Sequence, residues 1–329
     1  MTAPVRTEAP SELVARLLRP IDGPEPAGPS VRDEPVYGQI REALREEDDL
    51  PQGAWQRARK VADPALAIRL ASQVLATQSK DLQVATWLTE ALLRRDGVPG
   101  LRDGLAVLRG LVERFWDGVH PGLEDGDPIL RAAPLEYVGL KLRAAVRGAP
   151  VTAARHSFVD HADALLAGTE EEGRKDAGRE KLRKQLADRQ RPVIEEIAKA
   201  IDATPKAFYR ALDTAFAEAQ GHVAALEALA DERFPEDPPS FRVLRDTLAD
   251  LAPLAAQLLG QKLVTDPDPV SLDGAGDGGG GDGDGGAAPP APADDDVVAG
   301  AAAPPSTPAS GGGGGGAIAA RPTGRDDAL

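Results

Sequence analysis

The sequence contains no cysteine, which excludes disulfide bonds, thiolate zinc sites, iron–sulfur clusters and cysteine nucleophiles. Basic residues are also in deficit, because 38 Lys and Arg stand against 53 Asp and Glu, for a formal net charge of −15. An acidic chain repels phosphate backbones, so nucleic-acid binding is disfavoured. The densest basic stretch, Arg174 to Arg191, is interleaved with Asp176, Glu180 and Asp188. We therefore expect a solvated mixed-charge helix face there rather than an anion site.

Long apolar runs are missing too. No run approaches the roughly 20 residues that are needed to span a bilayer. The longest, around Leu251 to Leu259, is interrupted by Pro253 and Gln257. The segment from Met1 to Pro10 lacks the apolar core of a signal peptide. The sequence therefore predicts a cytoplasmic protein without direct membrane insertion.

The sequence signatures of common catalytic and cofactor sites are absent, including Gly-x-Ser-x-Gly, the phosphate-binding glycine loop and His-Glu-x-x-His. His156 and His161 are five residues apart, which does not place two metal ligands on one helix face. His120 is better interpreted as a capping or packing residue than as a catalytic base. The acidic glycine tract from Asp273 to Gly286 lacks the ligand spacing of a calcium loop. We therefore expect no catalytic, cofactor-binding or metal-binding residues, and an enzyme with an unrecognised site is the competing class.

Apolar residues recur at helical spacing through most of the first 265 residues. Asp63-Pro64 and Thr204-Pro205 each place proline where a helix begins. No segment alternates apolar and polar residues as a strand does. The sequence predicts an all-α fold of antiparallel, bundle-like helical blocks. The clearest stripe, with steps of four and three, consists of Leu101, Leu105, Leu108, Val112 and Phe115.

Composition divides the chain into four parts. Residues 1–30 read as an extended arm with one short helix started by Ser11. Residues 31–150 and 151–265 read as two helical domains. Residues 266–329 consist mostly of Gly, Asp, Ala and Pro, and cannot bury enough apolar area to offset chain entropy. We expect this last part to be a disordered acidic linker.

Several polar and aromatic residues invite either a structural or a contact role. Trp87 and Trp116 lie beside apolar stripes, which favours core packing. Trp55 sits in a loop-like context and either pins that loop or marks a contact surface. Asp81 stands near a predicted helix N-terminus, where its charge interacts favourably with the helix dipole. Lys80 is positioned to pair with a buried acid, and we favour a structural role for both residues.

These residues also carry a family resemblance. Over about residues 13–150 the sequence resembles the N-terminal domain of the ImpA/TssA family of bacterial type VI secretion components. The string from Ser79 to Ala85 followed by Trp87 to Ala91 is its most specific part. The resemblance implies structural or partner-contact roles for Trp55, Lys80, Asp81, Leu82, Trp87, Leu88, Gly104, Leu105, Trp116, His120 and Pro121.

The resemblance continues past this domain. Thr204 to Tyr209 and Pro239 to Phe241 resemble the middle region of longer TssA proteins. Arg325 to Leu329 resembles the start of a C-terminal domain that some members carry, so we expect the chain to stop where that domain begins.

The resemblance implies a non-enzymatic assembly role without cofactors. Family members contact baseplate, sheath, tube and membrane-complex proteins, and help initiate or guide tube and sheath polymerisation. They are recruited with the apparatus to the inner face of the cell envelope. They form homo-oligomers mostly through the C-terminal domain, so self-association should be weakened here. The alternative that stays open is a helical scaffold or adaptor of an unrelated cytoplasmic assembly.

Overall fold

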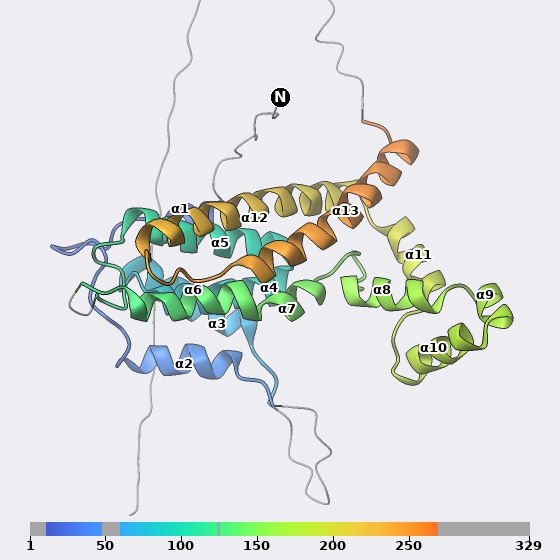
Figure 1. Cartoon of the computed structure of the whole chain (residues 1–329), viewed down its shortest axis with the longest axis horizontal. Coiled ribbons are helices and arrows are strands. Elements are labelled where there is room, and N and C mark those ends of the chain that lie inside the picture. Colours follow the sequence, from blue (N-terminus) through green and yellow to red (C-terminus); the bar gives the residue numbers. More distant parts are fainter. Residues whose placement is uncertain (1–10, 48–59, 124–125, 269–329) are drawn as a thin grey trace, which may run out of the picture. The chain divides into compact units, whose positions relative to one another are not determined.

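The computed structural model describes residues 11–47, 60–123 and 126–268 (Figure 1). Within these ranges the chain forms thirteen helices, and its only β-type pairings are isolated bridges. The predicted all-α fold is therefore confirmed. One compact unit runs from Met1 to Val270. Nearly all of the predicted acidic linker, from residue 269 onward, lies outside the described residues.

The helical hairpin of α4 (Leu82–Asp96) and α5 (Val98–Arg114) forms the centre of this unit. Gly97 alone joins the two helices, with a φ of 71° that favours glycine. Gly104 lets the helices approach closely, because a Cβ there would lie 2.6 Å from the Thr89 Cα. Gly100 lies inside α5, because proline at the second position of this helix already starts it.

Shorter helices cover the hairpin. The capping residues predicted for two of them are confirmed, because the side chains of Ser11 and Asp63 accept from the backbone N–H groups of Val14 and Leu66. Helix α3 packs on α4, α2 packs on α3, α1 packs on α5, and α6 packs on α4. Their bounds are α1 (Glu12–Leu17), α2 (Pro35–Leu44), α3 (Pro64–Thr77), α6 (Ile129–Lys141) and α7 (Arg143–Arg147).

Two long helices complete the same core. Helix α12 (Lys206–Arg233) packs along α5, and α13 (Arg242–Thr265) returns along α12 and contacts α6 and α7. The boundary expected at residue 150 therefore falls inside one compact unit, because the apolar face of α12 is buried against the first block rather than within a second one. The N-cap of α13 is Phe241, and the Ser240 hydroxyl accepts from the Arg242 N–H at 3.4 Å.

Four helices between α7 and α12 pack mainly on one another (Figure 1). Helix α10 contacts α8 and α9, and α11 contacts α8. The only buried residue of α10 is Leu186, so this helix contributes little apolar area to the core, whereas Phe158 of α8 packs against Phe216 of α12. Among the helices described, none combines the length and the apolar character that a bilayer span requires. The bounds are α8 (Phe158–Ala167), α9 (Glu170–Lys175), α10 (Ala177–Asp188) and α11 (Ile194–Ala203).

Candidate functional site: a buried polar node

The turn before α4 and the segment after α5 meet through their main chains. The His120 N–H donates to the Lys80 carbonyl, and the Leu82 N–H donates to the His120 carbonyl, both at 2.8 Å. The Lys80 N–H donates to the Ala27 carbonyl at 2.7 Å, and His120 Nε2 lies 2.9 Å from the Gly28 carbonyl oxygen. The extended arm is thereby fastened to the hairpin. We refer to Lys80, Asp81, His120 and Arg131 together as the buried node.

The Lys80 side chain is fully buried, with 0% of its surface exposed. Its Nζ donates to the carbonyls of Leu17 in α1 and Leu75 in α3, and lies 5.4 Å from the centre of the Phe115 ring. The sequence position of Lys80 suggested pairing with a buried acid. Among the described residues no acid pairs with it, and Lys80 instead joins the backbones of two helices. Burial lowers the pKa of its ammonium group to about 8.

Replacing Lys80 with Met should remove a pH dependence of stability. Between about pH 8 and pH 10.5 the unfolded chain still binds the Lys80 proton while the folded chain has released it. The free energy of unfolding of the unmodified chain should therefore rise with pH across this window, by at most about 3 kcal/mol. Urea denaturation of both chains along a pH series measures this. A stability difference between them that does not change from pH 7 to pH 11 would contradict the assignment.

Asp81 lies at the N-terminus of α4, as the sequence predicted, and serves there as the N-cap. Its Oδ1 accepts from the Val84 N–H at 2.9 Å, and burial raises the pKa of this carboxyl group. The apolar family-motif residues of the hairpin lie in the hydrophobic core. Leu82, Leu88 and Leu105 are all fully buried. The position of Asp81 thus fixes where α4 begins relative to the core.

Arg131 completes the buried node, although the sequence analysis did not identify it. This side chain of α6 is fully buried and donates to the carbonyls of Trp116, Val119 and Pro121, the last two at 2.7 Å. Desolvation lowers the pKa of its guanidinium group. The available signal was spacing, because Arg131 precedes Leu135 by four residues and so falls on the buried face of the predicted helix. Arg131 holds the loop after α5 in the path that brings His120 to Lys80.

The tryptophans within the described ranges serve packing, as expected. The Trp116 ring lies 4.7 Å from the guanidinium carbon of Arg131 and 5.5 Å from the Phe234 ring centre. Trp87 is half buried and meets Tyr37 edge-on, with ring centres 4.6 Å apart. Trp55 lies outside the described residues. Trp116 therefore links the buried node to the end of α12.

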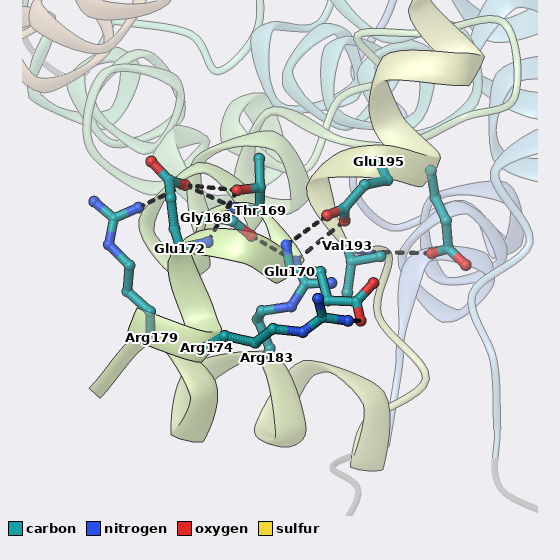
Figure 2. Close-up of polar contacts among 10 residues, drawn as sticks. Gly168, Thr169, Glu170, Glu172, Arg174, Arg179, Arg183, Val193 and Glu195 are labelled. Atoms are coloured by element: carbon teal, nitrogen blue, oxygen red, sulfur yellow. Dashed lines mark hydrogen bonds and ion pairs between the residues drawn. The ribbon is translucent and has the colours of Figure 1, made fainter. Parts of the chain in front are cut away.

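The basic stretch from Arg174 to Arg191 forms a mixed-charge surface, which confirms its interpretation. Figure 2 shows Arg179 beside Glu172 and Arg183 beside Glu195. The nitrogen–oxygen distances of these two ion pairs are 3.0 Å and 3.1 Å. Arg183 also donates to the Gly168 carbonyl. These contacts connect α9 and α10 to α11. Arg179 and Arg183 are paired with carboxylates and are therefore not available to bind an anion.

Within the described ranges, no three His, Asp or Glu side chains are arranged to hold a metal ion. An open cleft beside the start of α12 is lined by Lys206 and Arg210, and both cations pair with Asp268 at its edge. The buried node therefore serves to position backbone segments. Its polar groups bind main-chain carbonyls and N–H groups and set the path of the arm, the hairpin and α6.

Comparison with known proteins identifies this part of the chain. The family model described as ImpA, N-terminal, type VI secretion system matches residues 18–139, which contain the whole buried node. Over 67 residues the chain is 42% identical to the type VI secretion system component TssA1 of Pseudomonas aeruginosa. Residues 18–139 therefore form an ImpA N-terminal region, and the chain is similar to TssA components of type VI secretion. That match spans 20% of this chain and 20% of the length of the curated relative.

A solved structure extends the likeness beyond the ImpA region. The chain matches the TssA N-terminal domain from Burkholderia cenocepacia with a TM-score of 0.62 and 29% identity. The match covers 80% of this chain and 99% of that domain. It therefore includes helices that follow the ImpA region, in agreement with their shared core. The fold over most of this chain thus resembles that of a solved TssA N-terminal domain.

Proposed function

We propose that this chain is a non-catalytic adaptor of the type VI secretion apparatus. In this proposal it contacts baseplate, sheath, tube and membrane-complex proteins and helps initiate or guide polymerisation of the tube and sheath. It acts from the cytoplasm, at the inner face of the cell envelope. The similarity to TssA components supports a role in this apparatus. The buried node supports the non-catalytic character of that role.

One observation carries the adaptor role. The side chains of the buried node are used to hold backbone segments together rather than to present a reactive group. Lys80 and Arg131 are both fully buried, and their donors are directed at main-chain carbonyls. A rigid scaffold positions outward-facing side chains for binding partners. The partners in this proposal are proteins.

The test is recovery of partners from cells that carry the apparatus. A tagged chain should retain at least one baseplate, tube, sheath or membrane-complex subunit, identified by mass spectrometry. The matched control carries Arg131→Met, which should weaken the fold and lower recovery. A stable, folded chain that enriches none of these subunits would contradict the proposal and favour a scaffold of another assembly.

A further inference from the structure

The first turn of α12 and the chain that leaves α13 meet at one open cleft. Lys206 and Arg210 of α12 line this cleft together with Arg102 of α5. Arg102 is already paired with Asp103 and Glu218, at 2.9 Å and 3.3 Å. Lys206 and Arg210 are therefore the cations that the cleft offers to an acidic occupant.

A short acidic segment of the same chain occupies the cleft. It consists of Asp266, Pro267 and Asp268, and we call it the linker root because the Gly- and Asp-rich sequence follows it. Arg210 Nη2 donates to both carboxylate oxygens of Asp268, at 2.8 Å and 2.6 Å. Lys206 Nζ donates to the Asp266 carbonyl at 2.7 Å and lies 3.1 Å from a carboxylate oxygen of each aspartate. Among the described residues, no other acid pairs with either cation.

The spacing of the two carboxylates matches that of the two cations. Lys206 and Arg210 stand four residues apart on one helix face, which separates them by about 6 Å. Asp266 and Asp268 stand two residues apart in a non-helical segment, which spans about 6–7 Å. Proline follows each aspartate in the sequence and disfavours the helical conformation there, and α13 accordingly ends at Thr265. The Asp-Pro-Asp-Pro sequence thus ends the helix and presents two carboxylates at the spacing that α12 requires.

Few apolar contacts hold the end of α13 in place. The last buried residue of this helix is Leu258, and Val264 is 83% exposed. In addition, the Lys262 side chain donates to the Asp202 carbonyl at 2.8 Å. The last turn of α13 and the linker root are therefore held mainly by charged groups at the surface. Such contacts are individually weak and are screened by salt.

We propose that the linker root is an electrostatic strap, which docks in the cleft beside the start of α12 and releases the last turn of α13 when its carboxylates lose their contacts with Lys206 and Arg210. In the closed state, Asp268 is the fixed origin of the acidic sequence that follows. In the open state, that sequence gains length and reach, because the end of α13 joins it. The proposal does not depend on which secretion proteins the chain binds.

Distances between spin labels test the strap, and the absence of native cysteine allows selective labelling. The labels are attached to the whole chain at Ala224→Cys and Val264→Cys, two exposed positions. Ala224 lies 18 residues from Lys206, about 27 Å along α12, which suits double electron–electron resonance. The distance distribution should be narrow at about 0.05 M salt and at least twice as wide at about 1 M salt. Asp266→Asn combined with Asp268→Asn should widen it as much at low salt.

Further variants separate charge pairing from a general loss of structure. Replacing both aspartates with Glu keeps the charges and should keep the distribution narrow. Lys206→Met combined with Arg210→Met should widen the distribution as the Asn variant does. Combining these cation changes with the Asn changes should widen it no further, because both sets remove the same contacts. Asp250→Asn, at an exposed acid of the same helix, is the matched control and should have no effect.

Three results would overturn the proposal. They are a distribution that stays narrow in the Asn variant, a width that is the same at both salt concentrations, and additive widening when the cation and carboxylate changes are combined. Far-UV circular dichroism confirms that each variant is folded. Partner recovery from cells is a separate measurement, so a failure here leaves the adaptor role standing.

Discussion

Arg131→Met should lower the free energy of unfolding by about 4 kcal/mol, among the largest effects that one substitution can have in this fold. The guanidinium group donates to three main-chain carbonyls in the segment between α5 and α6. Methionine fills much of the same volume but donates nothing, so these carbonyls lose their partner inside the protein. Each buried acceptor left without a donor carries a desolvation cost. Urea denaturation followed by circular dichroism measures the loss.

The matched control is Arg109→Met in α5. Arg109 pairs with Glu113 at 2.6 Å, but both side chains are partly exposed to solvent. An exposed pair of this kind contributes less than about 1 kcal/mol. If both variants lose the same stability, the special role given to Arg131 is incorrect.

Gly139→Ala should destabilise the chain by about 3 kcal/mol and do so in a single transition. A Cβ at this position of α6 would overlap the Ser240 carbonyl and lie 2.9 Å from the Phe241 Cα. Both neighbours are main-chain atoms, which cannot rotate away as a side chain would. Helix α6 must therefore separate from the segment that leads into α13. Because this contact joins the two halves of the core, thermal unfolding followed at 222 nm should shift to lower temperature as one step.

Gly221→Ala in α12 is the control for this substitution. A Cβ at Gly221 meets no atom within 4 Å, and alanine is a better helix former than glycine. This variant should gain about 0.5–1 kcal/mol. Two separate unfolding steps in Gly139→Ala, with only the later step shifted, would show that the halves unfold independently.

Helix positions were predictable because their signals are local. Asp63-Pro64 identified the start of α3 from two adjacent residues, and the stripe from Leu101 to Phe115 identified α5 from its period. The shared core of α12 with α5 was not predictable. An apolar face on Phe216 and its neighbours shows that a helix needs a partner, but not which helix supplies it.

The buried node shows the same limit at the level of single residues. Asp81 was placed correctly near a helix N-terminus, because the signals that start a helix lie within a few residues of one another. The acceptor of Lys80 in α1 is a carbonyl 63 residues away in the chain, and main-chain carbonyls carry no sequence signature. Arg131 was overlooked for a related reason, since an arginine on a helix usually reaches solvent by extending its long side chain. Its burial follows from the loop it binds, which the sequence does not reveal.

The way in which Lys80 and Arg131 are anchored bears on how this fold tolerates divergence. A buried cation that pairs with a carboxylate depends on one other side chain. A substitution of that side chain leaves the cation without a partner. Lys80 and Arg131 instead donate to main-chain carbonyl oxygens, which every amino acid provides. Replacement of Leu17, Leu75 or Val119 by another apolar residue leaves the acceptor in place. The buried node thus depends on the path of the main chain and not on the identity of the side chains along it. The surrounding sequence can change as long as this path is kept.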